Sequence, residues 1–267
     1  MANDFTLPPK AIIGMIHVHA TPASPFFSGN VQDIVTSALQ DARILMEGGC
    51  NALLIENMHD RPHLLGNVGP EVVAMMTAVG CAIRDIIDLP LGVQVLCGAN
   101  EEAIAVAQAC KAQFIRADAF VFSHISNAGI TTQADAGPLL RYRKQISAGE
   151  IAIFADIKKK HGSHAITADL SIGDIAREAE YFGADGVIVT GASTGLPTNP
   201  DDVKQAKEQV FVPVLVGSGV SPENIASLWP HADAFIVGSY LKHEGDWRQP
   251  VDPRRVEALM RVTHKEI

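Results

Sequence analysis

The stretch VPVLVGSGVSPEN, residues 212–224, indicates most directly which fold the chain adopts. Its unbroken apolar run at 212–216 predicts a parallel strand that is buried on both faces. Small residues follow the run, and Ser221 with Pro222 predicts the capped start of a helix over 222–228. The stretch therefore encodes a strand, a turn and a helix, the repeating unit of a parallel α/β protein.

The same unit recurs along the whole chain. Strands are predicted at residues 11–16, 52–55, 92–96, 114–116, 151–155, 186–189, 212–216 and 234–237. Helices are predicted at residues 31–47, 71–87, 101–111, 139–147, 172–182, 202–209, 222–228 and 253–263. Eight units without a linker predict an α/β protein, a single-domain (β/α)8 TIM barrel over residues 1–267. A doubly wound open sheet is the competing fold, but no GxGxxG motif follows the first strand.

The composition excludes several classes of protein. With 21 basic and 30 acidic residues the net charge is −9, which disfavours a nucleic-acid partner. The 4 cysteines form no CxxC pair, which is typical of reduced thiols in a cytoplasmic protein. No apolar run approaches the ~18 residues of a transmembrane segment. We expect a cytoplasmic protein with no cofactor, and a homo-oligomer because barrels of this size often associate.

Two glycine-rich turns predict where a phosphate binds. Gly217, Ser218 and Gly219 follow the seventh strand, and Gly238 and Ser239 follow the eighth. Small residues let the backbone approach an anion closely, and these two turns form the recurring phosphate site of TIM barrels. Tight turns without a ligand are the alternative interpretation.

Ionisable residues follow several predicted strands, at the end of the barrel that carries active sites. Asp156 is the first candidate for general acid or base and Glu56 is the second. Lys158 is expected on the same side of its strand as Asp156, where it could form a Schiff base. Further catalytic candidates are Arg116, Lys160, His161 and His17, and candidate substrate-binding residues are Asn57, Asp118, Thr190, Gly191 and Thr194.

His17 and His19 raise the alternative of a metal-dependent hydrolase, because an HxH pair after the first strand can open a metal site. Such sites also need a His or Lys from strands four to six and an Asp from strand eight. Strand eight ends in Gly238 and Ser239 instead. We therefore assign no metal ligand, although a mixed site of His17, Glu56 and Asp156 is left open.

The chain resembles the BtpA/SgcQ family over nearly its whole length. The motifs that carry the resemblance are IGMIH at 13–17, EGG at 47–49, IEN at 55–57 with Asp60, FIR at 114–116, RYR at 141–143, Asp156 with KH at 160–161, TG at 190–191 and 194–195, VGSGV at 216–220 with EN at 223–224, IVGS at 236–239, and VD at 251–252 with RV at 255–256. The resemblance implies a phosphate-binding-type TIM barrel. The sequence departs from the family pattern at Cys97, Ala117 and Lys158, which changes residues near the barrel mouth.

The family resemblance leaves the function open. It implies a role in photosystem I accumulation for cyanobacterial members, and a link to sugar or nucleoside metabolism for many bacterial ones. The leading hypothesis is an enzyme that acts on a phosphorylated sugar or nucleotide-like molecule by isomerisation, lyase chemistry or glycosyl-bond cleavage. The alternatives are a non-catalytic assembly factor of the photosystem I type and the metal-dependent hydrolase that uses His17 and His19.

Overall fold

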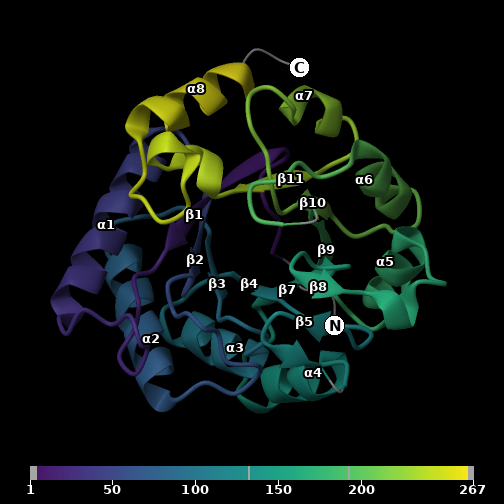
Figure 1. Ribbon diagram of the computed structural model, residues 1–267, viewed down its shortest axis with the longest axis horizontal. Coiled ribbons are helices and arrows are strands. Elements are labelled where there is room, and N and C mark those ends of the chain that lie inside the picture. Colours follow the sequence, from purple (N-terminus) through teal and green to yellow (C-terminus); the bar gives the residue numbers. More distant parts are fainter. Residues whose placement is uncertain (1–4, 132, 192, 264–267) are drawn as a thin grey trace.

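The computed structural model describes residues 5–131, 133–191 and 193–263. In these residues, eight parallel strands close into a barrel in the order β1-β2-β3-β4-β7-β9-β10-β11, with β11 returning to pair with β1. Helices surround the ring of strands in Figure 1. The predicted TIM barrel is confirmed.

The elements follow the predicted order. The barrel strands are β1 Ala11–His17, β2 Ala52–Glu56, β3 Leu91–Gln94, β4 Phe114–Ala117, β7 Ala152–Ile157, β9 Gly186–Val189, β10 Val214–Val216 and β11 Ala234–Val237. The helices are α1 Val31–Glu47, α2 Pro70–Arg84, α3 Asn100–Ala109, α4 Ala136–Gln145, α5 Ile172–Tyr181, α6 Pro200–Lys207, α7 Ile225–Leu228 and α8 Pro253–Thr263.

Alternation along the strands divides the apolar residues into two cores. Ile12 and Ile16 of β1 point outward and pack in the large core between strands and helices. Ala11, Ile13 and Met15 point inward and pack in the barrel interior. At the N-terminal end of the barrel, the Phe5 ring stacks on Phe114 with ring centroids 6.0 Å apart. The lower barrel is therefore a packed apolar core rather than a channel.

The same alternation places polar side chains in the top layer of the barrel. On β1 the inward series runs through Met15 to His17, and on β2 it reaches Glu56. On β4 and β7 the inward series reaches Arg116 and Asp156. The strand period of two thus brings four ionisable groups from distant parts of the sequence to one end of the barrel.

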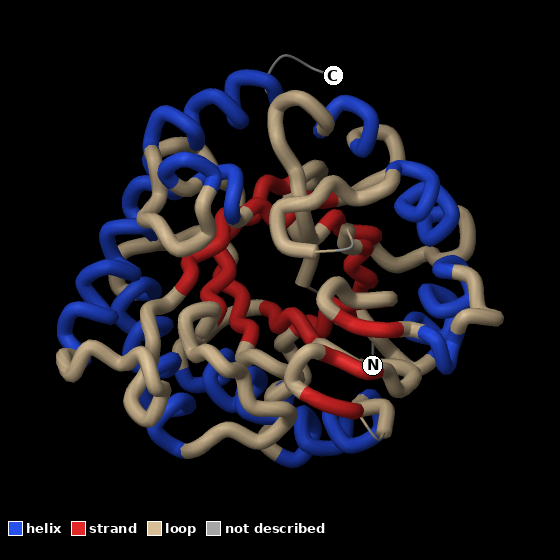
Figure 2. Tube along the Cα trace, in the orientation of Figure 1, coloured by secondary structure: helices blue, strands red, loops and turns tan. Residues whose placement is uncertain are grey.

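Several element bounds shift by two or three residues, for example β10, which begins at Val214, and two further differences concern the loops above the barrel. The helix α7 begins at Ile225, because the Asn224 side chain closes the preceding turn by accepting from the Ser221 N–H at 2.9 Å and donating to the Gly219 carbonyl at 2.7 Å. Ser221 therefore does not cap a helix over 222–228, and that prediction is wrong. The sequence analysis also missed a small antiparallel sheet of β5 Ile125–Ser126, β6 Gly129–Ile130 and β8 Gly162–Ser163, which lies beside the barrel ring in Figure 2.

Candidate functional site

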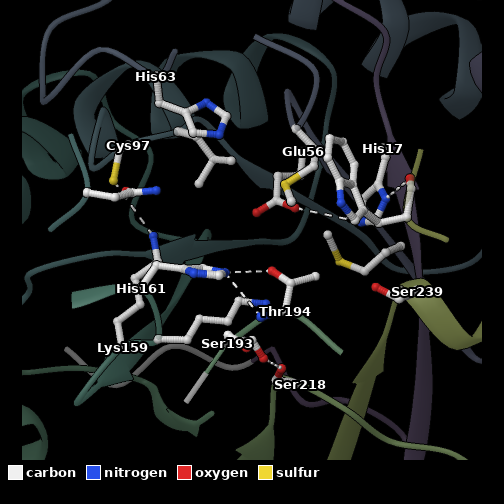
Figure 3. Close-up of a pocket in the computed structure, with 18 of the residues that line it drawn as sticks. His17, Glu56, His63, Cys97, Lys159, His161, Ser193, Thr194, Ser218 and Ser239 are labelled. Atoms are coloured by element: carbon white, nitrogen blue, oxygen red, sulfur yellow. Dashed lines mark hydrogen bonds and ion pairs between the residues drawn. The ribbon is translucent and has the colours of Figure 1, made fainter. Parts of the chain in front are cut away.

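A cavity of about 580 Å³ opens at the C-terminal end of the barrel strands. This volume lies within the range of small-molecule sites, about 300–1,000 Å³. Figure 3 shows Glu56 beside His17 on one wall, with Thr194, Ser193 and Ser218 across the cavity. The predicted site residues that line the cavity are His17, Glu56, Arg116, Lys160, His161, Thr194, Gly217, Ser218, Gly219, Gly238 and Ser239.

The turn after β10 comes close to the loop that follows β9. Gly219 has φ +63°, and a Cβ on it would lie 2.0 Å from the Leu196 carbonyl oxygen. The Ser218 carbonyl accepts from the Thr198 hydroxyl at 3.0 Å, and the Ser218 hydroxyl donates to the Ser193 carbonyl at 3.2 Å. No described residue accepts from the backbone N–H groups of Ser218 and Gly219. Ser218 and Gly219 both line the cavity, so their N–H groups are candidate donors to an anion.

The turn after β11 packs against His17. A Cβ on Gly238 would meet the His17 Nε2 at 3.1 Å, so glycine lets the imidazole lie against the backbone there. Ser239 begins the short 3₁₀ turn Ser239–Leu241 and lines the cavity. Both turns predicted for phosphate thus border the same cavity.

Two ion pairs lie in the layer beneath the cavity. Arg116 donates to both carboxylate oxygens of Asp156, at 3.0 and 3.1 Å, and both side chains are buried. Burial opposes the charge of Arg116, but Asp156 and Glu56 together raise the Arg116 pKa. Asp156 does not line the cavity. Burial raises its carboxyl pKa to about 6, while Arg116 pulls that pKa down. Asp156, the first candidate for acid or base, is therefore held by Arg116 behind the cavity wall.

Lys159 forms the second ion pair, with Asp118. Burial disfavours the charge of Lys159, but Asp118 reverses this effect and raises the Lys159 pKa. Gln94 also donates to Asp118, at 3.2 Å. Asp118 was predicted to bind substrate, but it lies behind the cavity wall as the partner of Lys159.

Lys160 lines the cavity beside this pair, and its surroundings are different. Its backbone N–H donates to the Thr190 hydroxyl at 3.0 Å, which fixes the start of the loop after β7. Burial, and then Arg116, lower the pKa of the Lys160 amine to about 8, although Glu56 and Asp156 oppose the shift. Thr190, a predicted substrate residue, is used here to hold the backbone and does not line the cavity.

His17 has a defined tautomer. Its Nδ1 lies 2.9 Å from the Trp247 carbonyl oxygen, which can only accept, so Nδ1 carries the proton and Nε2 carries the lone pair. Burial and the nearby charge of Lys242 hold the His17 pKa well below its usual range. The Nε2 lies 3.9 Å from a Glu56 carboxylate oxygen. A neutral imidazole and a carboxylate therefore face the cavity side by side.

Other predicted residues support the loops. The Asn57 amide accepts from the Leu96 N–H at 2.7 Å and donates to Asp60 at 3.0 Å. A Cβ on Gly191 would lie 2.5 Å from the Leu196 carbonyl oxygen. Asn57 and Gly191, both predicted to bind substrate, do not line the cavity. His161 Nε2 accepts from the Thr194 N–H at 3.1 Å and lies 2.8 Å from its hydroxyl, which joins two loops at the cavity edge.

The predicted HxH pair is divided between two environments. His17 faces the cavity, whereas His19 is exposed, 3.4 Å from the Ser37 hydroxyl and beside the His59 ring. Across the described residues no three His, Cys, Asp or Glu side chains gather closely enough to hold a metal ion. The geometry gives the mixed site of His17, Glu56 and Asp156 no support either, because Arg116 binds the Asp156 carboxylate.

Lys158 is also displaced from its predicted place. Its φ of +44° ends the strand alternation, and its ammonium group donates to the Leu170 carbonyl at 2.7 Å, away from the cavity. Lys158 would lie beside Asp156 only if the strand continued, but β7 ends at Ile157.

Several residues of the cavity wall are not among the sequence-predicted site residues. Arg61 lies between the Phe26 and Trp247 rings, with its guanidinium carbon 5.0 and 5.1 Å from their centroids. The further lining residues that were missed include His63, Leu96, Cys97, Ser126, Asn127, Lys159 and Trp247. Arg61 follows the second barrel strand and Trp247 follows the eighth, so no sequence motif connects them. Their position after barrel strands is the one sequence signal that they could belong to the site.

The fold and the cavity define the class of protein: a TIM barrel with a polar site at the C-terminal ends of its strands. The chain belongs to the BtpA family, whose sequence model matches residues 8–265. A mitochondrial protein of Caenorhabditis elegans is 38% identical, with 94% of this chain and 91% of the relative covered. The photosystem I biogenesis protein BtpA of Synechocystis is 33% identical, with 93% of this chain and 86% of the relative covered.

Solved structures confirm the fold. The (S)-3-O-geranylgeranylglyceryl phosphate synthase of Thermoplasma acidophilum, in complex with sn-glycerol-1-phosphate, has a TM-score of 0.61 at 16% identity, over 95% of this chain and 93% of the other. A 3-hexulose-6-phosphate synthase has a TM-score of 0.58 at 14% identity, over 94% of this chain and 99% of the other. Within the described residues, no helix has the length and apolar character needed to cross a bilayer.

Proposed function

We propose that the protein is an enzyme that acts on a small phosphorylated metabolite in the cavity at the barrel mouth. The observation that carries the proposal is the charge of the cavity wall: of the described lining residues, Arg61, Arg116, Lys159 and Lys160 are cationic and Glu56 alone is a carboxylate. Asp156 and Asp118 behind the wall neutralise Arg116 and Lys159, which leaves Arg61 and Lys160 against Glu56, a net positive lining in a chain with net charge −9. A cation-lined cleft concentrates anionic substrates.

The phosphate binds at the two turns after β10 and β11. Backbone N–H groups of Ser218, Gly219 and Ser239 supply donors, and Arg116 supplies a charge that Asp156 holds in place. The named activities of the structural neighbours on phosphorylated compounds are consistent with this assignment. The 4 free cysteines support a reducing, cytoplasmic location, and we also propose a homo-oligomer from the usual behaviour of such barrels.

His17 and Glu56 carry the proton transfers in this proposal, in place of Asp156. The His17 Nε2 lone pair is the general base, because the Trp247 carbonyl fixes the tautomer and burial keeps the ring neutral. Glu56, 3.9 Å away, accepts or returns a second proton. Because isomerisation, lyase chemistry and glycosyl-bond cleavage each use such a pair, the arrangement supports the proposal of a reaction in one of these classes.

A thermal-stability screen against sugar phosphates, nucleotides and inorganic phosphate tests the proposal. A ligand at 100 times its Kd raises the free energy of unfolding by about 2.7 kcal/mol. We expect Ser239→Asp to abolish the shift, because a carboxylate would face the bound phosphate. Ser227→Asp adds the same charge on α7, where Ser227 is exposed and outside the cavity, and is expected to keep the shift. No shift with any phosphorylated compound contradicts the proposal.

A role in photosystem I biogenesis is the second candidate, and the name of the Synechocystis relative favours it. In that case the protein acts through its surface and not through the cavity. Complementation of a strain that lacks the Synechocystis relative separates the two: a surface role survives Ser239→Asp, whereas an enzymatic role does not.

A further inference from the structure

Lys160 differs from the other described lysines that are buried or half-buried. Lys10, Lys158, Lys159, Lys207 and Lys242 each donate to a backbone carbonyl or a carboxylate. No hydrogen bond or ion pair joins the Lys160 ammonium to another described residue, although the residue lines the cavity. Partial burial of an ammonium without a partner costs free energy, and such groups often mark functional sites.

We propose that Lys160 is an amine nucleophile that forms an imine with substrate, and that the substrate class of this site is therefore phosphorylated aldehydes and ketones. The inference rests on the proposed function, because the phosphate turns at Gly217–Gly219 and Gly238–Ser239 border the same cavity as Lys160. The phosphate turns and the Lys160 amine line one cavity. A single substrate molecule with a phosphate group and a carbonyl group would therefore place the phosphate at the turns and the carbonyl near Lys160.

The charges around Lys160 support this role. Burial and the adjacent Arg116 lower its amine pKa to about 8 from the ordinary value of 10.5. At pH 7 such an amine is neutral about two orders of magnitude more often than an ordinary lysine. Lys159, the next residue, is held as a cation by Asp118. The site therefore contains one lysine suited to nucleophilic attack and one suited to charge stabilisation.

The covalent step balances with the groups present. The neutral Lys160 nitrogen attacks the carbonyl carbon, a C–N bond forms, and the carbonyl oxygen takes up a proton to give a carbinolamine. Loss of that oxygen as water, with one further proton, leaves the protonated imine. His17 Nε2 then removes a proton from the carbon next to the imine, the C–H electron pair forms the C=C bond of an enamine, and the C=N π pair moves onto nitrogen. Return of a proton from His17 to a carbon of the enamine restores an imine. Hydrolysis of the imine restores the amine.

Reductive trapping tests the proposal. The protein is treated with glyceraldehyde 3-phosphate and sodium cyanoborohydride, and labelled peptides are identified by mass spectrometry. Glyceraldehyde without phosphate is the matched probe. We expect a stable secondary amine on Lys160, formed faster with the phosphorylated probe and slowed by inorganic phosphate. The rate is expected to rise with pH to a half-maximum near 8 instead of near 10.5.

Two variants control the experiment. Lys160→Arg keeps a cation but cannot form the imine, and it is expected to lose labelling at this position while unfolding at the wild-type temperature. Lys158→Arg changes the lysine that is bound to the Leu170 carbonyl, outside the cavity, and is expected to label like wild type. Lys160→Met is a second variant that removes the charge if arginine proves too large.

The possible outcomes separate this inference from the proposed function. If inorganic phosphate stabilises the protein and Ser239→Asp removes that effect, but label appears only on exposed lysines such as Lys111 and Lys204, the imine is wrong and phosphate binding stands. If Lys160 labels equally with both probes and phosphate does not compete, the phosphorylated substrate class is wrong. Labelling of Lys160 that phosphate slows supports both.

Discussion

Lys159 and Lys160 are neighbours in the sequence and lie at the same barrel mouth, yet their electrostatic environments are opposite. Asp118 raises the pKa of the Lys159 amine, whereas burial and Arg116 lower the pKa of Lys160 to about 8. The contrast extends to the carboxylates, since Arg116 binds Asp156 in two places, while Glu56 has the neutral His17 at 3.9 Å as its neighbour.

The ion-paired side chains therefore have a structural role in the site, whereas the side chains without an ionic partner have a role toward the ligand. The pairs Arg116–Asp156 and Lys159–Asp118 form a satisfied ionic layer that fixes the floor of the cavity. The groups above this layer, Lys160, His17 and Glu56, keep their lone pairs or charges available to a ligand. Breaking a pair should cost stability, and changing an unpaired group should cost function.

The largest effect is expected when one partner is removed from the ionic layer. Arg116→Met leaves the buried Asp156 carboxylate without a counter-charge, and we expect the free energy of unfolding at pH 8 to fall by about 3–5 kcal/mol in urea. The control is Arg261→Met, which breaks the exposed pair with Glu257 and should change little. Arg116→Met with Asp156→Leu should recover much of the loss. If Arg116→Met is as stable as Arg261→Met, the Arg116–Asp156 pair does not stabilise the fold and the structural role of the ionic layer is wrong.

The same substitution at the two adjacent lysines gives the second test. Lys159→Met leaves Asp118 buried and unpaired, with an expected cost of about 3 kcal/mol. Lys160→Met removes an unpartnered ammonium, so the free energy of unfolding should stay within about 1 kcal/mol of wild type or rise. Urea unfolding measures both. If Lys159→Met and Lys160→Met lose the same free energy of unfolding, Lys160 has a structural partner and the contrast between the two lysines is wrong.

The phosphate turn depends on backbone geometry instead of ions. Gly219→Ala places a Cβ 2.0 Å from the Leu196 carbonyl oxygen at φ +63°, and we expect a cost of about 1–3 kcal/mol with loss of stabilisation by phosphate. Gly149→Ala is the control, because a Cβ there meets nothing within 4 Å. Differential scanning calorimetry with and without phosphate measures both effects. Retained phosphate stabilisation in Gly219→Ala would place the anion elsewhere.

The smallest expected effect is the pH dependence that His17 contributes. Because its folded-state pKa lies well below 6.5, the unfolded chain takes up the proton first as pH falls. His17 therefore contributes stability above pH 6.5 that is lost progressively below it, by at most about 1.4 kcal/mol per pH unit. His17→Gln should lose less stability than wild type between pH 7 and pH 5, relative to its own value at pH 7, as thermal unfolding would measure. Parallel pH profiles would show that His17 is not held neutral.

The sequence was sufficient for the barrel and for part of the cavity wall at its mouth. Continuous apolar runs such as 186–189 and 234–237 matched β9 and β11 at both ends, because burial on both faces leaves a local signal. The strand period of two then placed His17, Glu56 and Arg116 in one layer. The small sheet of β5, β6 and β8 was missed because its strands are two residues long and carry no periodic pattern.

What only the tertiary structure decided is which of these groups pair. In the run Lys158, Lys159 and Lys160, one ammonium group binds a carbonyl, one binds Asp118 and one has no described partner. Asp156 was predicted as the acid or base and is bound to Arg116, while His17, which had a lesser role, is fixed by the Trp247 carbonyl 230 positions away. The charge state of a buried group depends on atoms within a few ångströms, and sequence spacing does not determine those distances.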